Sequence, residues 1–183
     1  MGEGKRPRIV IDRGNQIVDV ETYSTNKCSK NAKRLYDSTH GFKSDVWTDQ
    51  HYMIRLHIGD ENGMREGIDI EDVKSLINDT FNHVVNYALK YGTIINFPPF
   101  IQNKSVRIVL QNRMDVVDDI LNVAIEYHFV DVHTYEITIW TAMNTRDFFI
   151  RDGQYVVQLH HDKTSLFKNM KKTLTQLCEF ERL

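Results

Sequence analysis

The sequence predicts an α+β fold in which helices cover one face of a four- to five-stranded, mainly antiparallel sheet, with a further helix at the C-terminus. Apolar residues recur at three- and four-residue steps between residues 69 and 91, as in an amphipathic helix, and later segments change to a two-residue period. The chain of 183 residues suits a single domain, residues 1–183, with an N-terminal part, 1–45, and a core, 46–183.

The N-terminal part is expected to form a hairpin followed by a basic surface segment. Residues 8–12 and 16–23 are β-prone, and the turn-forming sequence Arg13-Gly14-Asn15 separates them. Residues 24–44 are polar and rich in Lys and Arg, which is typical of a short helix or loop on the surface.

Two helices are expected next. Thr48 stands where an N-cap would begin a short helix that ends near His57, and Asp69 caps a second, longer helix. The apolar residues of the second helix are Val73, Leu76, Ile77, Phe81, Val84, Val85, Ala88 and Leu89. Gly92 follows in the C-terminal stop position, so the second helix should pack one face on the core.

The remaining residues predict an antiparallel meander and a closing helix. The expected strands cover residues 93–97, 105–110, 121–130, 135–140 and 155–159. The closing amphipathic helix is expected from the spacing of Leu166, Phe167, Met170, Leu174, Leu177 and Cys178. With helices on one sheet face, the other face would carry Glu126, His128, Glu136, Thr138 and Trp140. A face with this mixture of polar and aromatic groups can be a site.

Composition restricts the function classes. Lys and Arg total 23 against 25 Asp and Glu, and the formal net charge of -2 excludes a globally basic nucleic-acid binder but leaves room for a local basic patch. Cys28 and Cys178 are far apart and belong to no zinc-type cluster. No apolar run approaches the roughly 20 residues of a membrane helix. We therefore expect a cytoplasmic protein with reduced thiols, no membrane association, no metal site and no cofactor.

His51 and Arg55 are the first candidates for chemistry. Side chains four residues apart on a helix lie within about 6 Å at Cβ. An imidazole titrates near neutral pH and a guanidinium holds its charge, so together the two groups can transfer a proton and bind a phosphate. The alternative, which is more common, is a surface His and a surface Arg without a role.

The run Gln50-His51-Tyr52-Met53-Ile54-Arg55, followed by Arg65, Ile68-Asp69 and Val73, resembles the signature of RegB/RelE-like endoribonucleases of phage and toxin type, which share the BECR fold. The resemblance covers about 25 residues and the order of the later elements. It implies metal-independent RNA cleavage, in which the neighbouring 2′-hydroxyl attacks and leaves a 2′,3′-cyclic phosphate. By position, His51 matches the family's active-site histidine, Arg55 matches the phosphate-binding arginine, and Arg65 matches its basic residue.

The second catalytic histidine of this family has no counterpart at the matching position, where Asn78 stands. His83 lies more than a turn later, and on an apolar helix a packing role is the alternative. His128 could supply the acid, with Glu126 two residues away on the same side of a strand to orient it or to raise its pKa. The alternative for this pair is an exposed polar pair on the sheet.

Several residues could complete an RNA site. Trp140 could stack on bases. Arg146, and Lys104 or Arg107, could surround a phosphate, although ordinary surface charges are the alternative. The adjacent His160 and His161 would point to opposite faces of a strand, which argues against a metal site.

Two hypotheses follow from the sequence. The first is a metal-independent endoribonuclease that acts on single-stranded or ribosome-associated RNA. The second is a non-catalytic phage or toxin-derived protein that binds a host protein or RNA, and an antitoxin is a further expected partner of the toxin type. The His-x-x-x-Arg pattern favours the first hypothesis, and the mildly acidic charge favours the second.

Overall fold

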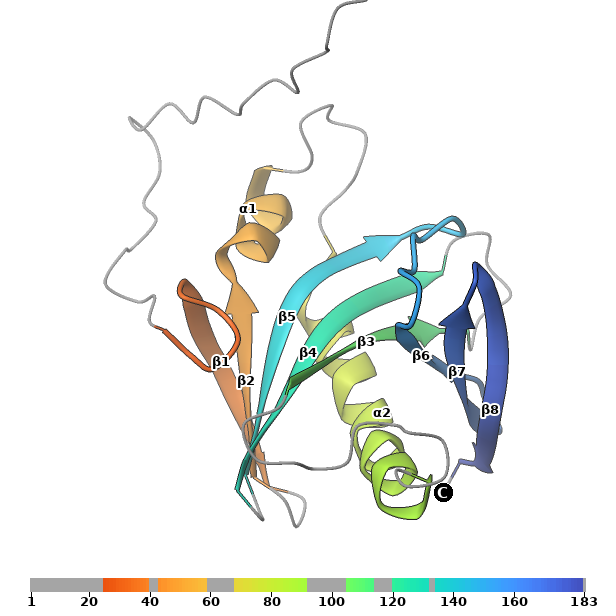
Figure 1. The fold of residues 1–183 in the computed structure, drawn as a ribbon. Helices are drawn as coiled ribbons and strands as arrows, with labels where there is room; N and C mark the ends of the chain where they lie inside the picture. The colour runs from red at the N-terminus through yellow and green to blue at the C-terminus, as the bar shows by residue number, and fades with distance from the viewer. Residues whose placement is uncertain are drawn as a thin grey trace, which may run out of the picture.

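One mixed sheet of eight strands organises the protein (Figure 1). The computed structural model describes residues 25–39, 43–58, 68–91, 105–113, 120–131 and 134–182. The elements are β1 (Ala32–Thr39), β2 (Lys43–Asp49), α1 (Gln50–Ile58), α2 (Ile70–Tyr91), β3 (Ser105–Asn112), β4 (Leu121–Asp131), β5 (Thr134–Asn144), β6 (Tyr155–Leu159), β7 (Lys163–Met170) and β8 (Thr173–Glu181). The hairpin expected at residues 8–23 and the strand expected at residues 93–97 lie outside these ranges.

The strand order, β1-β2-β5-β4-β3-β6-β7-β8, differs from the predicted sheet. The expectation of four to five mainly antiparallel strands is wrong, because the sheet has eight strands and two of its pairings, β2 with β5 and β3 with β6, are parallel. β6 therefore does not continue a meander from β5. The chain passes from β5 across to the far side of β3 before β6 begins.

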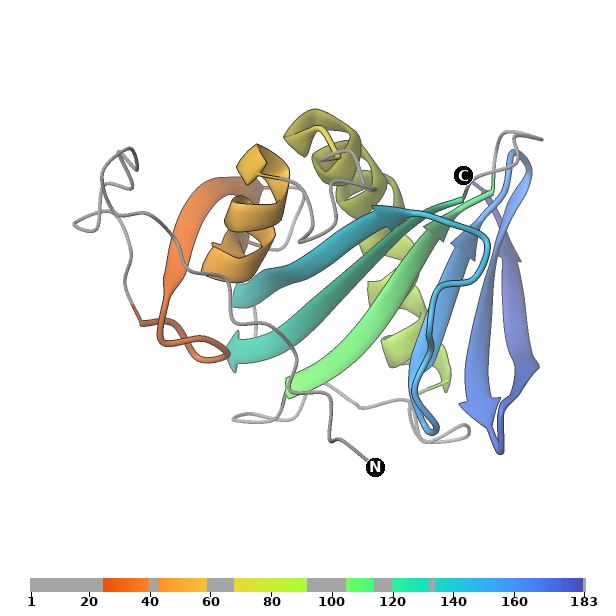
Figure 2. The same ribbon diagram turned by 90° about the horizontal axis from the view of Figure 1, so that it is seen from above.

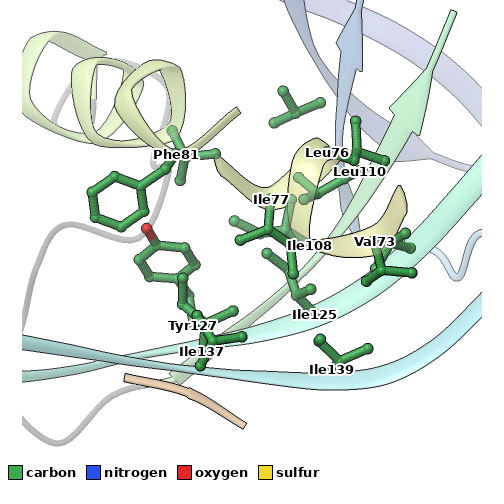
Figure 3. Close-up of a cluster of buried hydrophobic side chains, with 14 of the residues drawn as sticks. Val73, Leu76, Ile77, Phe81, Ile108, Leu110, Ile125, Tyr127, Ile137 and Ile139 are labelled. Carbon is green, nitrogen blue, oxygen red and sulfur yellow. The ribbon is translucent and has the colours of Figure 1, made fainter. Parts of the chain in front are cut away.

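The long helix α2 forms as the sequence predicts. Asp69 caps it, since its Oδ1 accepts a hydrogen bond of 2.9 Å from the backbone N–H of Glu71. The apolar side of α2 packs on the side chains that alternate residues of the strands present to one face of the sheet, here called the helix face (Figure 3). Phe81 stacks on Tyr127 of β4 with ring centroids 6.1 Å apart. Tyr87 donates a hydrogen bond of 2.7 Å to the carbonyl of Thr164 in β7, so α2 ties both halves of the sheet together.

The short helix α1 begins two residues later than Thr48. Asp49 acts as the N-cap, because its Oδ1 accepts a hydrogen bond of 2.9 Å from the backbone N–H of His51. Thr48 is buried in β2 instead. The buried hydroxyl of Tyr52 donates to the carbonyl of Ile68, which joins α1 to the start of α2.

Two segments cross the opposite face of the sheet, here called the outer face. The first, the N-terminal strap (residues 25–31), is held by Asn26, whose side-chain amide donates 2.7 Å to Thr138 Oγ1 of β5. The second, the linking segment (residues 145–154), leads from β5 to β6. It is held by the side-chain amide of Asn122, which donates 2.8 Å to the carbonyl of Thr145, and by that of Asn169, which donates 2.7 Å to the carbonyl of Ile150.

The basic segment 24–44 is not the surface helix or loop that the sequence suggests, since residues 32–39 form β1 and β2 begins at Lys43. β1 is the edge strand of the sheet and pairs with β2 in an antiparallel ladder that contains one bulge. Within the ranges described, no helix is long and apolar enough to cross a membrane.

The C-terminal helix is also a wrong prediction, because residues 163–181 form the β7–β8 hairpin. The β7–β8 register shifts where Leu166 and Phe167 pair with Cys178 and Gln176, so Leu177 is an extra residue that interrupts the two-residue period of β8, and the apolar positions imitate a helical spacing. The turn is Lys171-Lys172, with φ angles of 53° and 67°. Such a turn normally takes Asn or Gly, so the sequence carries no hairpin signal here.

This turn generates a stability prediction. A left-handed φ costs a residue with a Cβ about 1–2 kcal/mol, and Gly avoids this cost. We therefore expect Lys172→Gly to raise the free energy of unfolding by about 1 kcal/mol, measured by urea denaturation. The control Lys168→Gly, inside β7, should lower it by about 1 kcal/mol. A less stable Lys172→Gly protein would contradict the turn geometry.

Candidate functional site

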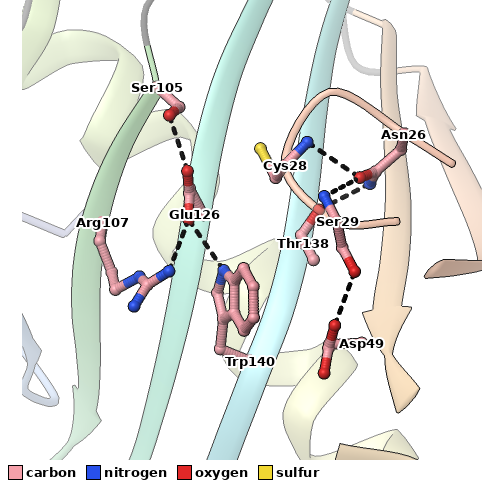
Figure 4. Close-up of polar contacts among 9 residues, drawn as sticks. All are labelled: Asn26, Cys28, Ser29, Asp49, Ser105, Arg107, Glu126, Thr138 and Trp140. Carbon is pink, nitrogen blue, oxygen red and sulfur yellow. Dashed lines mark hydrogen bonds and ion pairs between the residues drawn. The ribbon is translucent and has the colours of Figure 1, made fainter. Parts of the chain in front are cut away.

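A cluster of four side chains from three neighbouring strands lies on the outer face (Figure 4). Glu126 of β4 is its centre. Its Oε1 accepts a hydrogen bond of 2.7 Å from Ser105 Oγ, and its Oε2 accepts one of 2.8 Å from Arg107 Nη2 and one of 3.0 Å from Trp140 Nε1. We call these residues, Ser105, Arg107, Glu126 and Trp140, the Glu126 cluster.

A bulge in β5 positions the indole of the cluster. The β4–β5 register shifts between Ala124 and Ile125, which pair with Thr141 and Ile139, so Trp140 is the extra residue. Bulges re-aim side chains beside them. Trp140 can therefore reach Glu126, and the guanidinium of Arg107 lies over its ring, 4.4 Å from the centroid.

The carboxylate of Glu126 is held in its charged form. Burial on its own raises the pKa of this group, but the hydrogen bonds from Ser105 and Arg107, the charge of Arg107 and the hydrogen bond from Trp140 together lower the pKa below its ordinary value. The Glu126 side chain is 15% exposed and that of Arg107 is 38% exposed. The pair thus has a shielded anion and a cation that still reaches solvent.

The cluster borders an open groove with a volume of about 450 Å³. β3 begins three residues before its ladder with β6, which starts at Ile108 opposite Tyr155. Residues 105–107 of β3 therefore have no partner in β6, and the end of the linking segment lies next to them instead. The groove is lined by Ser105, Val106, Arg107, Glu126, Arg151, Asp152, Gly153, Gln154 and Tyr155.

Chemically, the groove lining offers two guanidiniums and a hydroxyl, and the Trp140 ring lies next to it, under Arg107. Arg107 comes from β3, and the exposed Arg151 comes from the linking segment. Guanidiniums bind phosphate oxygens through paired N–H groups, and an indole can stack on a planar ring. No group of three His, Cys, Asp or Glu that could hold a metal ion occurs in the part of the chain that the structure describes.

His128 lies on the same face but not at the groove. It is 6% exposed, and neither ring nitrogen has a hydrogen-bond partner among the described side chains and backbone. Glu126, expected to orient it, directs its carboxylate to Ser105, Arg107 and Trp140 instead. Burial lowers the pKa of His128, the charge of Glu136 opposes this shift, and that of Lys27 reinforces it. The imidazole is thus kept neutral.

The other predicted catalytic residues lie elsewhere. His51 is exposed in the first turn of α1. Arg55 follows one turn later in α1, and its side chain is not among those described. His83 is buried on α2, and burial, reinforced by the charge of Arg182, lowers its pKa. Because α2 covers the helix face, the sheet separates His83 from His128, and these two imidazoles cannot act on one phosphate.

The residues predicted to contact RNA also lie at different places in the chain and not at one site. Trp140 belongs to the Glu126 cluster, whereas Arg146 is exposed in the linking segment. Arg65 and Lys104 lie outside the described ranges. Sequence reasoning missed Ser105 and Arg151. A signal for Arg151 was available, because Asp152-Gly153 marks a turn before a strand and brings the preceding residue to the sheet end.

Cys28 of the N-terminal strap lies close to the cluster but is chemically inert. Burial, reinforced by the charge of Glu126, raises its pKa to about 12. The thiol is therefore protonated at neutral pH and is a poor nucleophile.

Comparison with protein-family models, with curated proteins and with solved structures finds no match to this chain. The geometry of the groove and the Glu126 cluster is therefore the basis for assigning a function.

The buried imidazole of His128 generates a pH prediction. Its pKa is lowered in the folded protein, so the unfolded chain takes up a proton first as the pH falls below about 6.5. The stability from neutral His128 is complete above that pH and is lost as the pH falls toward the folded pKa. We expect His128→Leu to lose less stability than the wild type between about pH 7.5 and about pH 5.5.

Urea midpoints at the two pH values check this expectation. The exposed His161 provides a matched control, and His161→Leu should retain the wild-type pH dependence. If His128→Leu and the wild type lost equal stability on acidification, His128 would not be held neutral by the fold.

Proposed function

We propose that the protein binds single-stranded RNA on its outer face, in the groove beside the Glu126 cluster. The observation that carries the proposal is the partly exposed guanidinium of Arg107, fixed over the Trp140 ring at the groove edge, with Arg151 also lining the groove. Phosphates and bases need these two kinds of group, cationic forks and a flat aromatic surface.

The size and preorganisation of the groove support the proposal. A volume of about 450 Å³ is within the range of small-molecule sites, so the groove can accept about one nucleotide at a time. Glu126 fixes Arg107 and Trp140 before any ligand arrives, which reduces the entropy that binding must overcome. The resemblance to RegB/RelE-like proteins favours RNA among the ligands that carry phosphates and bases.

The charge of the chain sets the expected strength of binding. With a formal net charge of -2, the protein gains no long-range attraction to nucleic acid. Affinity then depends on a few local contacts and should fall with salt. The cytoplasm, where RNA is abundant and thiols stay reduced, is the compartment that the proposal implies.

Cleavage of the bound RNA is the second candidate function. It would follow the family chemistry, without metal and through a 2′,3′-cyclic phosphate, and the exposed imidazole of His51 favours it because a proton-transfer group must reach the substrate. His128 is buried away from the groove, so no imidazole lines the groove among the residues that the structure describes. Binding without cleavage is therefore the function that the outer face supports best.

Binding is measured by fluorescence anisotropy with a labelled single-stranded RNA of mixed sequence. We expect Arg151→Gln, which removes an exposed guanidinium from the groove wall, to weaken binding by about threefold to tenfold near 0.1 M salt, with an unchanged melting temperature. Lys74→Gln on α2 is the matched control and should bind as the wild type. If no RNA bound, the proposal would be wrong, and a host protein would be the preferred partner.

Electrophoresis of the same mixtures in EDTA separates binding from cleavage. Intact RNA is the result that the binding proposal predicts. Products ending in a cyclic phosphate, formed by the wild type and not by His51→Ala, would instead support the endoribonuclease.

A further inference from the structure

The β7–β8 turn combines strain with charge. Lys171 and Lys172 both have positive φ angles, 53° and 67°, although residues with a Cβ avoid this region. Asn and Gly would fill such a turn without this cost. Strained residues that persist in a fold are frequent at functional sites, and here the strained pair carries two positive charges.

The same turn adjoins the groove. The backbone N–H of Lys171 donates a hydrogen bond of 2.6 Å to Asp152 Oδ1, and Asp152 lines the groove next to Arg151. The N–H of Gly153 donates a hydrogen bond of 2.7 Å to the carbonyl of Asn169, two residues before Lys171. Figure 2 shows the β7–β8 turn beside the chain that leads into β6. The turn is thus the next surface beyond the groove wall.

Positive charge continues along this line. Arg107 and Arg151 line the groove, and Lys171 is bonded through its backbone to the groove residue Asp152, so with Lys172 four cations lie at the groove and at the turn beside it. The acidic groups among them, Glu126 and Asp152, accept hydrogen bonds from Arg107 and from the backbone of Lys171.

We propose that the Lys171–Lys172 turn extends the RNA site, binding the phosphates of the nucleotides that leave the groove. This inference rests on the proposed function and names the second part of the path. Lysines act as point charges toward phosphates and carry no base preference, so the turn would add affinity and not sequence selectivity.

The test uses opposite effects on stability and on binding. Lys171→Asn/Lys172→Gly relieves the strain, so the melting temperature should rise by a few degrees. Two phosphate contacts are lost, so the RNA affinity should fall by about fivefold to twentyfold near 0.1 M salt, and the slope of log K against log salt should decrease in magnitude by about 1.4. Anisotropy titrations at several salt concentrations measure both quantities.

Two further variants separate the effect of the lysine charges from the effect of the backbone strain. Lys171→Gln/Lys172→Gln removes the charge but keeps the strain, and it should lose the same affinity without gaining stability. Lys171→Arg/Lys172→Arg keeps both the charge and the strain, and it should bind RNA with wild-type affinity. If the Gln variant bound RNA with wild-type affinity and salt slope, the inference would be overturned while the groove proposal stood. If the wild type bound no RNA, the proposed function itself would fail.

Discussion

The outer face depends on how one half-buried carboxylate is satisfied. A charge on Glu126 in the middle of a sheet is costly unless donors surround it. β3 supplies Ser105 and Arg107, and the bulge in β5 supplies Trp140. These bonds link three adjacent strands. They also leave the guanidinium at the groove edge with part of its surface in water.

The rest of the outer face is closed by polar side chains that bond to one another and to the crossing segments. Gln158 donates to Gln111 at 2.9 Å, and Gln111 donates to Asn122 at 2.6 Å, so one chain of amides crosses β6, β3 and β4. Asn122 then holds the linking segment through the carbonyl of Thr145. The groove remains open between these closed regions because β3 begins before its partner β6. His128 and Trp47, whose side-chain nitrogens have no hydrogen-bond partner in the described region, are exceptions on this face.

The sequence was a good guide where a single period ran through an element. The 3.6-residue pattern of α2 and its Asp69 cap were confirmed, and strict alternation placed Glu126, His128 and Trp140 on one face. The sequence-based prediction failed where the pairing of distant strands determines the structure. The parallel pairing of β3 with β6 leaves no local signal, and the bulge at Leu177 with the Lys171-Lys172 turn concealed the last hairpin. Arg107 lies on a strand that the sequence predicted, so it was a candidate. Arg151 reaches the groove only through the β5–β6 crossover, which the sequence did not predict, so it was not.

The proposed function requires that RNA contact the Glu126 cluster and its groove directly. The indole N–H of Trp140, hydrogen-bonded to Glu126, gives a resonance that can be followed in a ¹H–¹⁵N NMR titration with single-stranded RNA. If RNA binds in the groove, this resonance and the backbone signals of residues 105–107 and 151–154 should shift together in proportion to bound RNA. Shifts confined to α1, with the Trp140 resonance unchanged at saturation, would contradict the proposed function.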